Sequence, residues 1–340
     1  MTTHKLVSRR QLVYLALLAL AVFLFIPHLT GFNKVGILVS NAQPVYLLIA
    51  LGAEMLRYFA SSGSTVALAR LFDRPVPYFE MTEAFFAGAA LNRVFSTGGA
   101  PGMVVRLVFL LKHHVTTGSV AAIYLIEDII GLVIGLIIFV VGIVTIASRE
   151  TSSFANDLAV GFAVGTIPLA IGAIFVIRNR PGMERLVHGL ARAGDTVFQR
   201  FFHRSIYTPE RVEHSLDDFY LGMNAARCRP HLVALSFLMN GLRYGGGSVA
   251  LYFSFLALDQ AIAPGVLLLL YTTTSLLSST SAVLGEVAIM GTGFAILSRA
   301  LGLAPDVAVV GLIVSRTLAF WMPLPVGLLA FLHLRQRHDL

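Results

Sequence analysis

Two hydrophobic segments of this chain are interrupted by small and polar residues, and they constrain its fold more than any other feature. Residues 84–128 form an apolar arm, the break STGGAPG at 96–102, a second arm, a short polar turn and a long hydrophobic helix. Residues 271–316 repeat that order around the break SSTSAVLG at 278–285. Interrupted hydrophobic segments at matching places in two halves of a membrane protein point to a substrate site near the bilayer midplane.

The composition indicates an all-α polytopic membrane protein. Of the 340 residues, 56% are hydrophobic and 13% are charged, and several apolar runs reach the length that spans the hydrocarbon core. We expect no cleaved signal peptide, because the basic N-terminus leads into an apolar run that ends at Pro27 without a small-residue cleavage site. The single cysteine, Cys228, excludes an intramolecular disulfide and a cysteine metal cluster.

We predict one transmembrane domain over residues 1–340, with about six full spans and two re-entrant hairpins. The full spans are expected at residues 11–30, 45–69, 117–147, 158–177, 231–257 and 306–333. The arms of the first hairpin are too short to cross a bilayer, so that hairpin should enter and leave on one side. The organisation is a first half at 1–147 with hairpin 84–111, a linker at 178–230, and a second half at 231–340 with hairpin 264–302.

The distribution of basic residues predicts the orientation. Seventeen lysines and arginines fall on the side of the N-terminus, and three fall on the opposite side. Because cytoplasmic loops carry the excess of basic residues, both termini should be cytoplasmic, in a bacterial inner membrane. The two hairpins then enter from opposite sides, and the halves form an inverted-topology repeat.

The linker is the one sizeable polar stretch. Its periodic apolar residues between many arginines are typical of helices that lie along an anionic leaflet, and a solvated connection explains them equally well. It is too short for a catalytic domain and holds no phosphate-binding glycine motif.

Nine charged residues fall inside the predicted membrane segments, where each costs about 3 kcal/mol near the bilayer centre. Glu54 and Arg57 share one helix face at i,i+3 spacing, which favours an internal ion pair. A role in binding is favoured for the charges at or just after the breaks. The candidate binding residues with charge are Arg93, Arg106, Glu127, Asp128, Arg243, Glu286 and Arg316.

The first break suits an anionic group. Pro101 and Gly102 begin a half-helix whose N-terminal amides would face the midplane, and Gly98 and Gly99 let backbone approach a ligand. Arg106, about one turn later, could hold a phosphate bidentately.

Other candidates near the hairpins have structural alternatives. Asn92 and Arg93 could add donors from the other arm, although Arg93 could equally extend to the interface. Arg243 precedes three glycines, a pattern of close helix packing as much as of ligand contact. Gly285 lies next to Glu286 at the second break.

The stretches LNRVFSTGGAPGMVVRLVFLL and LGEVAIMGTGFAILSRALGL, with the helices that follow, resemble the two signatures of the lysylphosphatidylglycerol synthetase/flippase transmembrane family. The resemblance covers nearly the whole chain and implies a flippase-like membrane domain with inverted hairpins. By it, Arg106, Glu286 and Arg316 match charged family positions, and Glu127 and Asp128 fall in its charged cluster. Two departures, Met103 in place of a glutamate and no prolines before Gly285, separate this chain from the headgroup specificity of the best-known members.

We therefore expect a lipid flippase that translocates an anionic or zwitterionic lipid, either a phospholipid or a polyprenyl-phosphate-linked one. The family's aminoacyl transfer resides in a separate soluble domain, so we expect no catalytic residues, no metal and no cofactor here. Membrane lipids are the expected ligands, nucleic acid is not a partner, and the small-residue faces permit a homodimer. Two alternatives remain open: a scaffold for an envelope glycosyltransferase or lipid synthase, and a membrane enzyme that acts on lipid phosphates.

Overall fold

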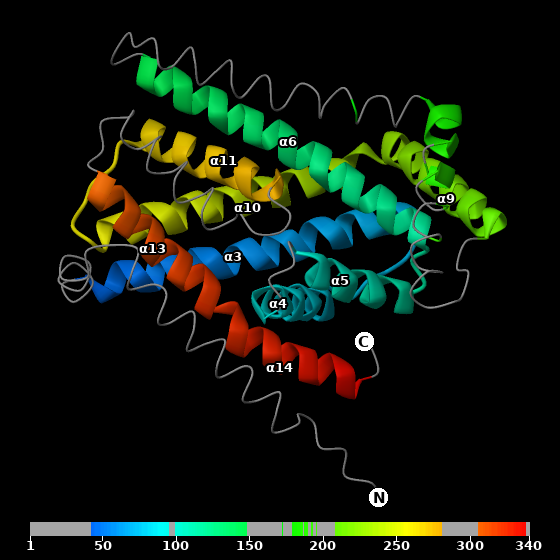
Figure 1. Cartoon of the computed structure of the whole chain (residues 1–340), viewed down its shortest axis with the longest axis horizontal. Helices are drawn as coiled ribbons and strands as arrows, with labels where there is room; N and C mark the ends of the chain where they lie inside the picture. The colour runs from blue at the N-terminus through cyan, green and yellow to red at the C-terminus, as the bar shows by residue number, and fades with distance from the viewer. Residues whose placement is uncertain are drawn as a thin grey trace, which may run out of the picture.

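The structure is a computed structural model that describes residues 42–94, 99–147, 208–280 and 305–337, together with a few positions between 172 and 195. Within these ranges the secondary structure is entirely helical (Figure 1). The predicted span at 11–30, nearly all of the span at 158–177, and the second hairpin beyond Thr280 lie outside the described residues.

The helices of the first half follow the predicted order. They are α3 (Pro44–Ala69) with the short helix η2 (Arg70–Phe72), α4 (Tyr78–Val94), α5 (Ala100–Lys112) and α6 (Thr117–Ala147). The linker contributes α9 (Pro209–Cys228), and the second half contributes α10 (Pro230–Leu256), α11 (Pro264–Thr280), α13 (Pro305–Trp321) and α14 (Pro323–Gln336). Pro44 and Pro230 stand at the first turn of their helices, where the missing N–H costs nothing.

Helices α3 and α10 form an antiparallel pair at the centre of the bundle (Figure 1). At one end the amide of Gln43 donates to the carbonyl of Ala257 at 2.9 Å, and at the other Arg229 donates to Asp73 at 2.6 Å. Small residues allow the two backbones to approach closely: a Cβ on Gly246 would stand 2.9 Å from the carbonyl oxygen of Ala53.

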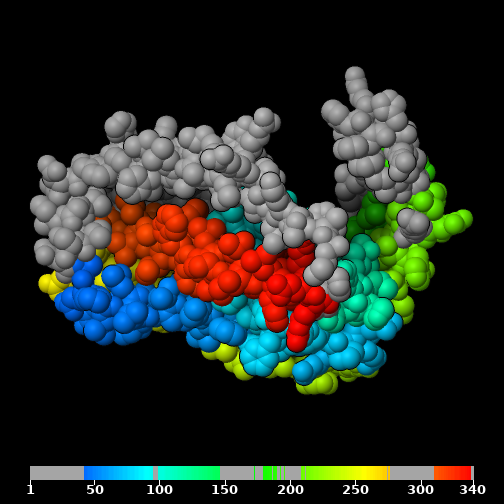
Figure 2. All heavy atoms as spheres, turned by 90° about the horizontal axis from the view of Figure 1, so that it is seen from below, coloured from blue at the N-terminus to red at the C-terminus, as the bar shows by residue number. Residues whose placement is uncertain are grey.

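The two halves exchange their outer helices. Helix α4 of the first half packs on α14 of the second, and α11 of the second half packs on α6 of the first. Helix α10 also contacts α6, and α3 contacts α13. Figure 2 shows α13 and α14 as one band that lies along α3 at one end and near the first hairpin at the other. The contacts of α4 with α14 and of α11 with α6 therefore correspond to each other, as do those of α3 with α13 and of α10 with α6.

Two predicted boundaries differ from the structure. The span expected at 306–333 is divided at Met322 into α13 and α14, because Pro323 and Pro325 have no N–H to continue the helical hydrogen bonds. The first hairpin begins at Tyr78 and not at residue 84. Glu80 in its added turn pairs with Arg337 at 2.6 Å, a contact from the far end of the chain.

The linker helix α9 packs against the protein. Its apolar face, with Leu216 and Phe219 each 5% exposed, lies on the first turns of α6. A Cβ on Gly118 would collide with the carbonyl oxygen of Ser215, so glycine is required at this contact. In this described part of the linker, Leu216 and Phe219 therefore face the protein.

Two stretches of the described part are long and apolar enough to cross a membrane by length and composition: Thr117–Thr145 in α6, with 29 residues, and Val310–Gln336, with 27, which runs from α13 through α14. Helices α3 and α10 are similarly long, at 26 and 27 residues, but less apolar. Polar side chains of the two helices face each other inside the bundle.

Candidate functional site

A polar cluster surrounds Glu127 and Asp128, in the middle of the apolar helix α6. The hydroxyl of Thr65 on α3 donates to Oε1 of Glu127 at 2.7 Å. Thr65 itself is fully buried, whereas Asp128 faces outward from the bundle. An acidic pair in this position requires compensation, because a carboxylate in a membrane helix is costly unless it is paired or reaches water.

Arg106 of α5 approaches this cluster from the first hairpin. Its guanidinium carbon lies 4.7 Å from the ring centre of Phe85 and 5.2 Å from that of Tyr124. It is close enough to Glu127 and Asp128 to interact electrostatically with both. Two aromatic faces therefore hold the guanidinium of Arg106 beside two acids. Among the described residues it forms no direct ion pair, so its N–H donors are available to another anion.

Arg243 of α10 reaches the same acids from the second half. It also interacts electrostatically with Glu127 and Asp128. A Cβ on Gly131 of α6, one turn beyond the acids, would stand 3.2 Å from Nη2 of Arg243. Gly131 therefore makes room for the arginine. Of the glycines that follow Arg243, Gly246 fits closely against α3 and Gly247 against Tyr271. This segment therefore serves close helix packing through its glycines and also brings Arg243 near the acids.

The N-terminus of α5 is held by its own hairpin. Gly99 has a φ of 87°, a backbone conformation that glycine adopts at little cost. The amide of Gly102 donates to Oδ1 of Asn92 at 2.6 Å, and a Cβ on Gly102 would stand 2.8 Å from the carbonyl oxygen of Gly88. Asn92 therefore caps the half-helix that begins at Pro101. Because Asn92 accepts from the amide of Gly102, that amide is not available to a ligand in this state. The α5 helix can still attract an anion through the positive end of its dipole.

The remaining charged candidates lie elsewhere. Glu54 and Arg57 form the predicted ion pair on α3, with Nε 3.0 Å from Oε2, although the pair lacks hydrogen-bond geometry. Arg93 lies 5.6 Å from the ring centre of Phe320 on α13, a contact inside the bundle. Arg316 is partly buried on α13. Gly98, Gly285 and Glu286 lie outside the described residues.

A line of buried polar residues between α3 and α10 was not predicted from the sequence. Ser64 and Ser236 share a hydrogen bond of 2.8 Å, and Asn240 donates to Ser64 at 2.8 Å. The three side chains are at most 1% exposed. Ser236 and Asn240 lie at i,i+4 on α10, and this spacing was the available signal.

The arrangement can bind charge of both signs inside the bundle. Two arginines and two acids come from α5, α6 and α10, so they belong to both halves of the chain. A phosphate could take the donors of the arginines, while an amine or hydroxyls could bind the carboxylates. No group of three or more His, Cys, Asp or Glu side chains that could hold a metal occurs in the described part of the chain.

Comparison with known proteins gives one assignment. The family described as the lysylphosphatidylglycerol synthase TM region matches residues 11–327. No curated protein and no solved structure gives a significant match. The match covers nearly the whole chain and agrees with the two long apolar helices, so the protein is a membrane protein with a lipid-related function. The chain belongs to the lysylphosphatidylglycerol synthase transmembrane-region family.

Proposed function

We propose that this protein is a flippase, which moves an anionic or zwitterionic lipid between the leaflets of a bacterial cytoplasmic membrane and is not an enzyme. The observation that carries the proposal is the polar cluster in which Arg106 and Arg243 interact electrostatically with Glu127 and Asp128. Charged groups are retained in membrane segments chiefly where they face a substrate path or one another. Here the acids lie between arginines from two different halves, and we assign the cluster to a substrate path.

The packing of the halves supports an inverted-topology repeat. Helices α3 and α10 hold equivalent places in the two halves and run antiparallel. The exchange of outer helices, α4 onto α14 and α11 onto α6, is what a two-fold axis in the membrane plane produces. Helices α4 and α5 have 17 and 13 residues, about 25 and 20 Å, which is shorter than a hydrocarbon core of about 30 Å. This supports a re-entrant first hairpin.

In this proposal the headgroup enters between the halves and the acyl chains stay in the lipid. Arg106 takes the phosphate, and Glu127 or Asp128 binds an amine or hydroxyls of the headgroup. Arg243 neutralises the acids when no substrate is present. Rocking of one half against the other moves Arg243 of α10 relative to the acids of α6, and this exposes the cluster to each side in turn.

The test is leaflet exchange in liposomes that contain the purified full-length protein. The panel of labelled lipids comprises phosphatidylglycerol, phosphatidylethanolamine, an aminoacylated phospholipid and a polyprenyl phosphate. Arg106→Gln removes the positive charge and should reduce exchange of the transported lipid by at least tenfold. Arg227→Gln is the matched control, because Arg227 lies exposed on α9 outside the cluster.

The outcomes separate the candidate functions. Exchange of one headgroup class that is lost in Arg106→Gln and kept in Arg227→Gln supports a transporter. Exchange at the wild-type rate in Arg106→Gln would refute the role of the cluster. Exchange of none of the four lipids by the folded wild-type protein would contradict the transport proposal and favour the scaffold.

A further inference from the structure

A second candidate site lies at the end of the bundle where the linker helix α9 meets the α5–α6 turn. Two adjoining cavities of about 520 and 470 Å³ open there. Four residues line both cavities: Arg74 after η2, His114 and Thr116 between α5 and α6, and Asp218 of α9. Each volume falls in the range of small-ligand sites. The intramembrane residues Arg106, Glu127 and Arg243 line neither cavity.

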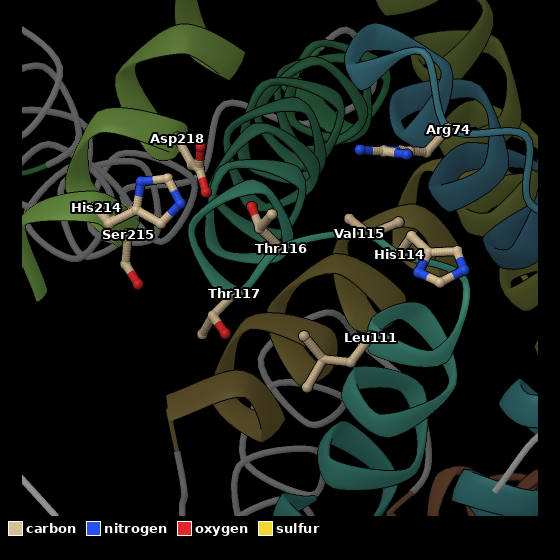
Figure 3. A pocket seen from close by; sticks show the side chains of 9 residues that line it. All are labelled: Arg74, Leu111, His114, Val115, Thr116, Thr117, His214, Ser215 and Asp218. Carbon is tan, nitrogen blue, oxygen red and sulfur yellow. The ribbon is translucent and has the colours of Figure 1, made fainter. Parts of the chain in front are cut away.

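Charges of opposite sign face this space without meeting each other. Figure 3 shows Asp218 and His214 on one side, Arg74 and His114 on the other, and Thr116 between them. Oδ2 of Asp218 is buried and accepts no hydrogen bond. Within the described part of the chain, Arg74 has neither a hydrogen bond nor an ion pair. Because a buried acceptor without a donor is costly, Asp218 indicates that a donor from outside the chain belongs there.

The side of the cavity opposite Asp218 suits an anion. Arg74, which lines both cavities, can donate to a phosphate bidentately. His114 has a φ of 61°, in the left-handed region that a residue with a Cβ adopts at a cost. Glycine would serve better as the cap of α5. The histidine side chain therefore stands in the cavity at the expense of a relaxed backbone.

Apolar residues at the margin point to a lipid as the source of the ligand. Leu111, which lines the first cavity, is 40% exposed, and Leu221, which lines the second, is 65% exposed. Exposed leucines beside a polar cavity at the end of a membrane bundle suit the first carbons of acyl chains next to a headgroup.

We propose that this cavity binds the headgroup of a zwitterionic phospholipid with a primary amine, of the phosphatidylethanolamine type, from the cytoplasmic leaflet. Arg74 and His114 hold the phosphate, and Asp218 accepts from the ammonium. A trimethylated amine has no N–H to donate to Oδ2, and a glycerol headgroup brings no cation. The proposal does not rest on the transport activity, since the cavity and the intramembrane cluster share no residue.

The test measures lipid retention by the full-length protein in detergent, with native mass spectrometry. Phosphatidylethanolamine, phosphatidylcholine and phosphatidylglycerol with the same acyl chains are titrated separately. Phosphatidylethanolamine should bind at least tenfold more tightly than the other two. Asp218→Asn should remove this preference, and Arg74→Gln should weaken all three lipids.

Neighbouring residues supply matched controls. Asp217→Asn changes the adjacent carboxylate, which pairs with Arg180 at 2.5 Å and lines neither cavity. It should leave the preference intact. His114→Gly removes the imidazole ring and also relieves the backbone strain at this position. Weaker lipid binding with an unchanged or higher melting temperature would therefore exclude a merely structural role for His114.

Three results would overturn the proposal. The first is equal binding of the three lipids to the wild type, and the second is an equal effect of Asp218→Asn and Asp217→Asn. The third concerns whether the ligand comes from the membrane. We expect soluble glycerophosphoethanolamine to displace the lipid only weakly. If the soluble ester bound as tightly as the lipid, the ligand would be a free phosphate ester and the membrane source would be wrong.

Discussion

Three consecutive glycines in α10 make the packing of the two halves measurable. A Cβ on Gly245 would meet nothing within 4 Å, whereas a Cβ on Gly246 would stand 2.9 Å from the carbonyl oxygen of Ala53. A backbone atom cannot move aside alone, so alanine at 246 must push α3 and α10 apart. The two positions are adjacent in the same helix, and Gly245→Ala is therefore a matched control for Gly246→Ala.

The expected energies follow from these contacts. Each substitution raises helix propensity by about 1 kcal/mol, and this gain cancels in the comparison. Gly246→Ala adds the cost of overpacking, about 1–3 kcal/mol. The free energy of unfolding should therefore be lower for Gly246→Ala than for Gly245→Ala by about 1–3 kcal/mol, and Gly245→Ala should be at least as stable as the wild type.

The assay is equilibrium unfolding in mixed micelles, followed by the fluorescence of the single tryptophan, Trp321. Leaflet exchange by the same variants shows whether the pair must also move during transport. Equal midpoints for Gly245→Ala and Gly246→Ala would refute the close α3–α10 contact. A less stable Gly245→Ala would refute its assignment to open space.

Three further outcomes are expected. Cys228, the single and exposed cysteine at the end of α9, should react with a membrane-impermeant maleimide in inside-out vesicles and not in intact spheroplasts; the reverse would invert the predicted orientation. The hydrogen bond from Arg229 lowers the pKa of Asp73 below its ordinary value of 3.8, so this pair stabilises the protein above that value and the contribution is lost as the pH falls through the lowered pKa. Asp73→Asn should flatten the acid side of the pH dependence of the melting temperature, and an unchanged profile would contradict the pair. Thr65→Val, which removes the donor to Glu127, should cost about 1–3 kcal/mol in the same unfolding assay, more than Thr65→Ser, which keeps the hydroxyl.

The course of the backbone could be predicted where local sequence determines it. The predicted bounds of α3, α6 and α10 agree with the structure to within one residue at each end, because prolines or polar turns flank long apolar runs. The division at Met322 was not predicted. A proline inside a membrane helix can kink the helix or be accommodated in it, and the outcome depends on the packing of neighbouring helices. The family was predicted correctly from the residues around the two breaks.

The composition of the polar cluster could be predicted only in part. Arg106, Glu127 and Asp128 were identified because charge in an apolar run is visible in one sequence. Thr65 was not identified, because hydroxyl side chains are common in membrane helices. Its partner Glu127 is 62 residues away in the chain, and their contact depends on how α3 and α6 pack. The capping of Gly102 by Asn92 also required the structure, and it changed the role expected for the α5 amides.

The two groups of intramembrane charges differ in what a movement of the halves does to them. Glu54 and Arg57 belong to one helix at i,i+3, so their contact persists however α3 is displaced. Arg243 and the acids of α6 belong to different halves, so their interaction changes when one half rocks against the other. A ligand can shift a conformational equilibrium only through contacts that differ between the two states. In the proposed mechanism, a headgroup bound to Glu127 or Asp128 would compete with Arg243 and would thereby act on the relative position of the halves. Exchange should therefore depend strongly on Arg243→Gln and weakly on the paired substitution of Glu54 and Arg57 by Gln, and equal losses would remove this distinction.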